Sequence, residues 1–557
     1  MKSRTSFFNV TVFKKNITRF APVWALYSVF LLMLMVLLAV DNESFYFASN
    51  IASSIGLFAI VNFFYAPLCA QLLFGDLYSS RMCNALHAMP LRREDWFCTN
   101  TVTGLLLSLV PNTAFAMLCL PLAGDLLIIP FLWLAAVTLQ YLFFFGTAVL
   151  ASYCVGNRFA MALVYLIING FSIIAYWLVE TMYAPLMYGV IIRDDIFFTL
   201  SPVVKMVSLM DAYLMVEKQG GYAFARWYFG EGWGYLGICA GLGILAMALA
   251  LLCYRKRDLE TAGDFAAVKP VGPVFLLLYT ICGGACCHGF FSVFLGDESE
   301  LFLFLGLAIG FYTGSMLLKR TVRVFKLKTF LGFGAVALAM ILSVIVVRTD
   351  LLGIVGWVPK AEQIQSVSIT TGGTSNYRNT HLTLTEPEDL EKILQIHQYG
   401  LQNRNAGTDG KRDARVLLRY TMKTGAVRER EYYVNVDTPC GDMIRYYISH
   451  PEMVLGDVYG KPDEFKLQGV EIAKEGDFIV SEEALRSLMD AILADCASGD
   501  LAQDWAYIDD YKMDYWISLR FVSKDGVHYY ADVHFTETSA NLMAWYHIQE
   551  ETLESAK

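Results

Sequence analysis

Residues 130–153, PFLWLAAVTLQYLFFFGTAVLASY, decide the fold of this chain. These 24 consecutive residues contain no charged side chain. A helix needs roughly 20 mostly apolar residues to cross a hydrocarbon core of about 30 Å, and only helices and closed barrels satisfy their backbone hydrogen bonds inside lipid. The stretch is therefore expected to form a transmembrane helix.

Eight further runs meet the same criterion of length and hydrophobicity. They span residues 22–40, 51–74, 97–120, 159–178, 234–253, 273–295, 301–318 and 330–347. The first of these runs begins too late for a cleaved signal peptide, whose apolar core would be shorter and followed by a small-residue cleavage site. We therefore expect a polytopic α-helical membrane protein with about nine transmembrane helices.

The composition of the whole chain points to the same class. Of its 557 residues, 56% are hydrophobic and 17% are charged, whereas a soluble protein averages about a quarter charged residues. This excludes an ordinary soluble enzyme and a disordered chain. Residues 1–348 carry 23 basic and 18 acidic side chains, and residues 349–557 carry 20 and 34. A basic membrane part is thus expected to precede an acidic, water-soluble tail.

The basic residues of the connecting loops indicate the orientation, because short loops rich in Lys and Arg stay in the cytoplasm. One set of alternate loops holds 18 Lys and Arg, and the other set holds four, all within residues 179–233. The N-terminus is therefore expected inside, and nine spans place residues 349–557 outside. This topology implies a multi-pass protein of the plasma membrane with an extracellular C-terminal domain.

The tail is expected to be an α+β extracytoplasmic domain built from an internally duplicated module. A helix, a hairpin and a second helix recur in the same order, at offsets of 95, 101 and 99 residues. The matching segments are 390–394 and 485–489, 417–429 and 518–530, and 443–448 and 542–547. This nearly constant spacing predicts two repeats, at about 362–450 and 467–550.

Other segments of the membrane part are expected at the bilayer surface. Residues 1–20 place apolar side chains before Lys14 and Lys15, which predicts an amphipathic elbow helix on the inner surface. Residues 179–233 contain apolar patches too short to span, so short re-entrant helices in the outer leaflet are expected. Residues 254–348 would form a cytoplasmic linker and three extra spans.

The common catalytic motifs are absent from the sequence. It contains no Walker A pattern, no H-E-x-x-H and no G-x-S-x-G. We therefore expect no enzyme activity, no metal and no cofactor in this chain. The seventh span holds a cluster of Cys282, Cys286, Cys287 and His288, whose neighbouring glycines favour helix packing over a metal or redox site. The tail holds Cys440 and Cys496, which could form a disulfide if the tail is extracytoplasmic. The sequence does not set the distance between them, so whether they pair stays open.

Five polar side chains fall inside the predicted spans. They are Asn62, Gln71, Asn112, Gln140 and Asn169. Amides at such positions typically hydrogen-bond between helices, since unsatisfied polar groups in hydrocarbon are costly. A translocation path lined by the same side chains is the alternative.

The most informative loop joins the second and third spans and reads GDLYSSRMCNALHAMPLRREDW, residues 75–96. Asp76 and the serines after Tyr78 supply helix-capping chemistry, and Pro90 ends the helix before two arginines. Between these ends runs an apolar stripe at helical spacing, made of Met82, Leu86 and Met89. Such a helix suits docking on another protein, and the alternative is a helix that lies on the lipid surface.

This loop resembles that of bacterial ABC-2-type permeases, the membrane subunits of ABC exporters. The resemblance rests on the order of Asp76, Arg81, Leu86, Pro90, Leu91 and Arg93. A second match, RKRDLETAGD, is similar to the R-x-x-E-x-A-G segment after the sixth span in a Gram-positive branch of that family. Its matching residues are Arg255, Arg257, Glu260, Ala262, Gly263 and Asp264. The resemblance covers about residues 1–270 and implies a six-helix permease core at 21–253 with a coupling helix at 76–93.

The resemblance also implies partners. A separate ATP-binding cassette subunit would hold ATP and magnesium, a second permease copy or paralogue would join it in the lipid bilayer, and nucleic acid would play no part. The side chains expected to dock on the ATPase are Asp76, Arg81, Met82, Leu86, Met89, Arg92 and Arg93. The family implies an exporter, with an antimicrobial peptide or a lipid-like molecule as its substrate.

The alternative function is a membrane-anchored sensor or receptor. Its extracytoplasmic domain would bind an extracellular ligand, and the acidic tail would attract a cationic peptide by its electrostatic field. Removal of residues 349–557 separates the two functions, because a transporter core would keep coupled ATPase activity whereas a receptor would lose ligand binding.

Overall fold

The computed structural model describes residues 8–39, 44–89, 92–124, 126–193, 195–208, 214–219, 224–229, 232–268, 270–295, 300–371, 381–403, 413–459, 461, 464–472, 477–479, 481–501, 515–524 and 528–556. The chain divides into two compact units. The first comprises Met1–Met182 and Arg193–Leu342, and the second comprises Tyr183–Ile192 and Ser343–Lys557. A short segment between two helices of the first unit therefore belongs to the second.

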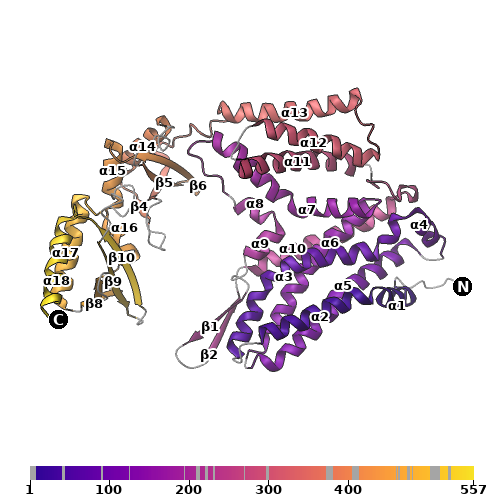
Figure 1. Cartoon of the computed structure of the whole chain (residues 1–557), viewed down its shortest axis with the longest axis horizontal. Coiled ribbons are helices and arrows are strands. Elements are labelled where there is room, and N and C mark those ends of the chain that lie inside the picture. Colours follow the sequence, from indigo (N-terminus) through magenta and orange to yellow (C-terminus); the bar gives the residue numbers. More distant parts are fainter. Residues whose placement is uncertain are drawn as a thin grey trace. The chain divides into compact units, whose positions relative to one another are not determined.

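Within the described ranges, nine helices are long and apolar enough to cross a membrane, as the sequence predicts (Figure 1). They are α2 (Ala21–Leu38), α3 (Ser44–Leu73), α5 (Arg93–Cys119), α6 (Ile128–Cys154), α7 (Arg158–Leu178), α10 (Gly232–Lys256), α11 (Val271–Leu295), α12 (Glu300–Lys319) and α13 (Leu327–Arg348). The chain thus has the helix lengths and composition of a multi-pass membrane protein. The N-in orientation stays a prediction.

Helix α6 lies at the centre of the first unit and packs against α3, α5, α7 and α10. Glycines allow the closest of these approaches, because a Cβ at Gly146 would lie 2.2 Å from the carbonyl oxygen of Gly243 in α10. Further along α6, Trp133 is fully buried between Phe58 and Phe115, with ring centroids 4.8 and 4.6 Å away. Small residues and aromatic contacts together hold this bundle, as is usual inside lipid.

Helices α11 and α12 pack on each other in the same way. A Cβ at Gly306 would lie 2.5 Å from the carbonyl oxygen of Gly283 and 2.4 Å from the Cβ of Cys287. The cysteine cluster of the seventh span therefore lies at a tight helix contact. No group of three or more potential metal ligands occurs in the part of the chain that the structure describes.

The segments expected at the bilayer surface contain more than short helices. Helix α1 (Val10–Arg19) follows the capping side chain of Asn9. Residues 179–233 include the short helices α8 (Asp195–Thr199) and α9 (Pro202–Ser208), but also the antiparallel hairpin of β1 (Leu214–Gln219) and β2 (Phe224–Phe229). The expectation of helices alone is wrong here. The hairpin pairs Leu214 with Phe229 and Gln219 with Phe224, so the end of the apolar run at residues 203–215 continues into a strand.

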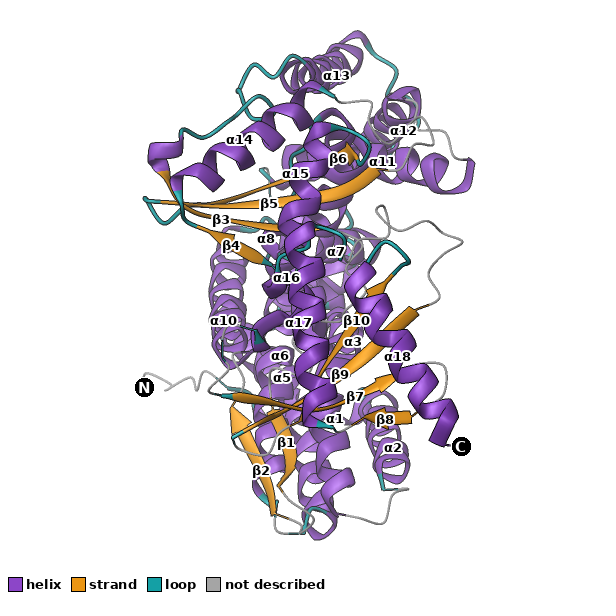
Figure 2. Ribbon diagram, turned by 90° about the vertical axis from the view of Figure 1, so that its left-hand side faces the viewer, coloured by secondary structure: helices purple, strands orange, loops and turns teal. Residues whose placement is uncertain are grey.

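The second unit contains two four-stranded antiparallel sheets (Figure 2). The first has the order β4-β3-β5-β6 and consists of β3 (Ile364–Thr371), β4 (Leu382–Leu384), β5 (Asp413–Met422) and β6 (Val427–Asn435). The second has the order β8-β7-β9-β10 and consists of β7 (Phe465–Ile472), β8 (Asp477–Ile479), β9 (Tyr515–Ser523) and β10 (His528–Phe535). Both sheets therefore have the same strand order.

Each sheet carries two helices in matching sequence positions. They are α14 (Pro387–Gln402) and α15 (Pro439–Ile448) for the first sheet, and α17 (Glu482–Ser498) and α18 (Ala540–Ala556) for the second. The register also shifts in both sheets near the start of the first strand, at Ile364–Ser366 and at Leu467–Gly469. We call these regions the first and second modules; that they arose by duplication stays a prediction.

Each module has its own apolar core, and one cysteine lies in each. Cys440 is buried in the core of the first module and Cys496 in that of the second. Neither forms a disulfide. Burial raises the pKa of each thiol to about 12, so both behave as small apolar side chains.

Candidate functional site

The loop between α3 and α5 begins with a tight turn and continues as a short helix. Residues Gly75–Tyr78 form a 3₁₀ turn, and α4 covers Ser80–His87. Within the turn, Leu77 is buried and Asp76 lies 3.7 Å from the guanidinium of Arg19 at the end of α1. The turn therefore connects α1 to α4, and Asp76 has a partner within the chain.

The loop from α4 to α5 exposes both apolar and basic side chains. Met82 and Arg81 are exposed on α4, and Met89 and Arg92 are exposed beyond its end; the two methionines are each 45% exposed. Cys83 faces inward and is buried, which the sequence pattern did not indicate. The side chain of Leu86 lies outside the described part. The predicted stripe is thus free to dock at Met82 and Met89, while Cys83 holds the helix against the first unit.

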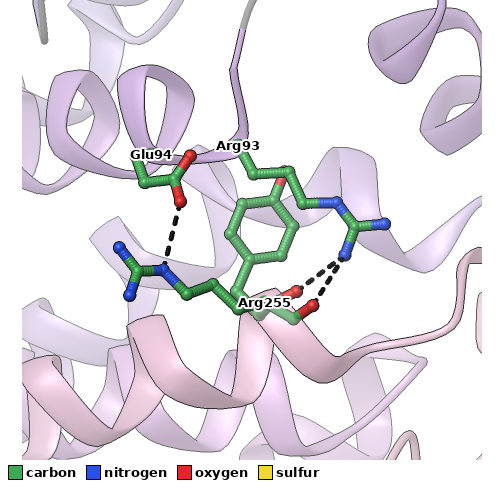
Figure 3. A network of polar contacts seen from close by, with 4 residues as sticks. Arg93, Glu94 and Arg255 are labelled. Carbon is green, nitrogen blue, oxygen red and sulfur yellow. Dashed lines mark hydrogen bonds and ion pairs between the residues drawn. The ribbon is translucent and has the colours of Figure 1, made fainter.

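Arg93, at the start of α5, is turned into the chain. Its Nη1 donates hydrogen bonds to the carbonyl oxygens of Tyr254, Arg255 and Arg257, at 2.9, 3.4 and 3.1 Å. Figure 3 labels Arg93 and Arg255 of this group. These carbonyls lie at the C-terminal end of α10, where the last C=O groups lack intrahelical N–H donors and the helix dipole favours a cation. The guanidinium also lies over the ring of Tyr254, 5.6 Å from its centroid. The structure therefore gives Arg93 partners inside this chain, and its contact with an ATPase stays a prediction.

An ion pair beside Arg93 forms a second link between α5 and the end of α10. Arg255 Nε is 3.1 Å from Glu94 Oε1 (Figure 3). Both side chains are partly exposed, so this ion pair contributes little to stability by itself. It fixes the same two helix ends that Arg93 joins.

Arg257 is the buried member of the group, with only 4% of its surface exposed. Its Nη1 donates to the carbonyl oxygens of Ser152 and Tyr153, both at 3.4 Å, and its Nη2 donates to that of Leu77 at 3.1 Å. Burial lowers the pKa of Arg257, since desolvation opposes its charge. One side chain thus ties the end of α6 to the turn before α4. We call Arg93, Glu94, Arg255 and Arg257 the arginine hub.

The rest of the motif after α10 also bonds to its neighbours through the backbone. The amide of Gly263 donates to the carbonyl of Gly156 at 2.7 Å. Gly263 has φ +94°, a conformation that side-chain-bearing residues rarely adopt. Asp264 forms an ion pair with Arg320 at 3.2 Å, and Glu260 is exposed. The turn Leu259–Thr261 packs against α4. The motif therefore connects α4 with the ends of α6 and α10.

Four of the five amides inside the spans are buried and bonded to neighbouring groups. Asn62 donates to the carbonyl of Val137 at 3.2 Å, and Gln140 donates to that of Ile55 at 3.0 Å. The other two are Asn112, which accepts from the hydroxyl of Tyr27, and Asn169, which donates to the carbonyl of Tyr165. Most of these bonds join different helices, which favours the packing role over the lining of a polar path.

Gln71 is the fifth amide and lies at the end of α3. It donates to the carbonyl of Arg158 at 3.1 Å, at the start of α7. This contact joins the end of α3 to the start of α7. Gln71 therefore connects two helix ends, and a role in a translocation path stays a prediction.

No protein-family model, no curated protein and no solved structure matches this chain.

Proposed function

We propose that this chain is the membrane-spanning permease subunit of an ATP-driven ABC transporter, with ATP and magnesium held by a separate ATP-binding subunit. One observation carries the proposal. Helix α4 and the residues directly after it expose Arg81, Met82 and Met89, while Arg257 bonds the turn before α4 to the end of α6, from a position directly after α10. A protein that binds α4 would therefore act directly on two central helices of the first unit.

The arginine hub provides the physical route for such an action. Guanidinium groups that bind several carbonyls at once hold segments at fixed distances, because each buried carbonyl that lost its donor would cost about 1–3 kcal/mol. A push on α4 would then move α5, α6 and α10 together and would not be absorbed by the loops. Closure of two ATPase subunits would in this way tilt the spans and switch access to a central cavity.

The remaining parts of the proposal follow from the sequence. The charge of the loops supports a cytoplasmic N-terminus and an extracellular tail, and the resemblance supports a second permease subunit and export. A peptide or a lipid-like molecule is the substrate class to test first. The chain itself would carry out no chemistry.

The test is purification of the full chain with its partners in mild detergent. Mass spectrometry would identify a P-loop subunit, and a vanadate-sensitive ATPase assay would measure coupling. The double variant Arg81→Glu and Arg92→Glu removes two exposed cations of the loop without touching the hub, and we expect it to lose the ATPase. The control is Arg193→Glu, an exposed cation in the segment predicted on the other side of the membrane. Retention of the ATPase by the double variant would overturn the proposal.

A second candidate function is ligand reception by the tail, which one feature of the second module favours. An open groove of about 870 Å³ lies between β7, the end of β9 and the start of α17, with Phe465, Leu467 and Leu485 among its lining residues. Residues 451–557 carry 22 acidic and 8 basic side chains, so their field attracts cations. Binding of an oligolysine peptide to the full chain, lost in Leu485→Trp and kept in the exposed control Arg486→Trp, would support this candidate.

A further inference from the structure

The segment that follows α13 exposes large apolar side chains in a fixed loop. Leu351 and Leu352 are 74% and 68% exposed. The loop is held by Asp350, whose carboxylate accepts hydrogen bonds from the amides of Val355 and Gly356 at 2.9 and 2.7 Å. A loop closed in this way keeps its leucines in one place. They lie only three and four residues beyond Arg348, where the last membrane-length helix ends.

The same loop is bonded to the first module. Arg430 on β6 donates from Nη2 to the carbonyl of Ile354 at 2.7 Å. The guanidinium groups of Arg428 and Arg430 lie over the ring of Trp357, 4.5 and 5.2 Å from its centroid. Trp357 in turn meets the ring of Tyr420 edge-on at 6.0 Å. The exposed leucines, the tryptophan and the arginines are therefore parts of one rigid surface.

A second helix end is attached to the same module. Residues Tyr183–Ile192 begin in the last residues of the apolar helical segment Arg158–Leu186, and Gly189 and Val190 lie against β6. The amide of Glu431 donates to the carbonyl of Gly189 at 3.1 Å, and Val190 pairs with Arg430 as an antiparallel bridge. Two membrane-length segments thus end on β6 and on the loop that Arg430 holds. The first module therefore holds the chain directly after both of these segments.

The charge of the tail divides sharply between its modules. Residues 349–450 carry 12 basic and 12 acidic side chains, whereas residues 451–557 carry 8 and 22. An anionic bilayer would repel the second module but not the first. In the first, Arg348 and Arg428 are both exposed; Arg348 lies three residues before Leu351 in the sequence, and Arg428 lies over the ring of Trp357.

We propose that the first module docks on the bilayer through Arg348, Leu351, Leu352, Trp357 and Arg428, which we call the interfacial surface. The two leucines enter the interfacial layer of the leaflet at which the fifth and ninth spans end. Trp357 lies at the depth that indole rings prefer, and the two arginines bind lipid phosphates. The module is then a fixed part of the membrane surface, and only the acidic second module extends into solvent.

The test uses the full chain reconstituted in vesicles of equimolar phosphatidylcholine and phosphatidylglycerol. A fluorophore on Leu351→Cys is compared with one on Tyr530→Cys, an exposed position on β10 of the second module, after subtraction of the labelling of the unsubstituted chain. Lipids that carry a quencher near the head group are expected to remove most of the fluorescence at 351 and little at 530. Equal accessibility of both positions to a water-soluble quencher would overturn the proposal. It would also be the result if another protein, and not lipid, covered this surface in cells.

A second measurement tests the contribution of Arg428 to lipid binding. Arg428→Gln should reduce quenching at position 351 in the mixed vesicles but not in pure phosphatidylcholine. The matched control is Arg419→Gln, an exposed arginine on the opposite face of the same sheet, where it pairs with Glu429. An equal effect of both substitutions would show that the sheet has been disturbed and that Arg428 does not bind lipid phosphate.

Discussion

The two modules of the tail have the same strand order and very different surroundings. The first contains a buried, ionisable interior with His397 and Arg430, and its edge strand β6 carries residues Tyr183–Ile192. The second has an apolar position, Ile492, at the place that His397 holds under the 95-residue offset. It also has an open groove and most of the acidic charge. Shared strand order therefore does not fix the surroundings of a module, since only the first pairs with residues Tyr183–Ile192 and the groove lies in the second.

The largest expected effect tests whether Tyr183–Ile192 is part of the first module. Gly189 has φ +75°, and a Cβ there would lie 2.3 Å from the ring of Tyr432. Gly189→Ala combines backbone strain with overlap and should cost about 3 kcal/mol. Gly425→Ala is the matched control, because Gly425 also has positive φ but open space around its Cβ; it should cost about 1 kcal/mol. Hydrogen exchange of β6 in the full chain measures both, and equal loss of protection would contradict the packing.

The next effect concerns the helix pair of the second module. Asp495 on α17 is buried and accepts from the amides of Asn541 and Leu542, at 3.2 and 2.8 Å, at the start of α18. Asp495→Ala leaves these amides without their acceptor and should cost about 2–3 kcal/mol. Asp490→Ala, an exposed acid on the same helix, should have no measurable effect. Exchange rates of α18 distinguish the two variants; unchanged rates in Asp495→Ala would be the contrary result.

A pH effect should separate the modules further. Burial, with the charge of Arg430, lowers the pKa of His397 to about 4, and its Nδ1 lies 2.9 Å from the hydroxyl of Tyr420. Between its ordinary pKa of 6.5 and about 4, the unfolded chain binds a proton that the folded chain does not. Stability from this group is therefore present at pH 7 and is lost as the pH falls, by about 2 kcal/mol at pH 5.

The measurement compares exchange of β5 and β6 at both pH values, after correction for the intrinsic rates. His397→Leu should abolish the extra loss at low pH in the first module. Burial also lowers the pKa of His534 in the second module. The second module of the His397→Leu variant should therefore still lose protection at low pH, and it serves as the internal reference. If β5 and β6 still lose protection at low pH in the His397→Leu variant, another group causes the pH effect.

The smallest effect tests the helix pair of the first module. Tyr447 on α15 donates its hydroxyl proton to Asp389 on α14 at 2.9 Å. Tyr447→Phe removes this one bond and should cost about 1 kcal/mol. Tyr446→Phe, at an exposed position next to it, is the control. If the two variants behave alike, the first module does not depend on a polar link between its helices as the second does.

The sequence predicted the long helices well because each satisfies its own backbone hydrogen bonds and needs only its length and apolar composition. It also predicted the helix, hairpin and helix order of the tail, since alternation and turn residues are local signals. The hairpin at residues 214–229 was missed because an apolar run of that length fits a short helix equally well. The partners of Arg93 and Arg257 were missed for another reason. Both bind carbonyl oxygens, which every residue has, so no residue type reveals them.

By itself the sequence determined that this chain is a multi-pass membrane protein with an acidic α+β tail, because hydrophobic length and charge act locally and add along the chain. The tertiary structure alone decided which groups meet. It turned Arg93 inward, buried Arg257 among carbonyls from two segments, and attached residues Tyr183–Ile192 to a strand more than two hundred residues away in the sequence. Such contacts join distant segments through common backbone groups, and only the packed fold specifies them.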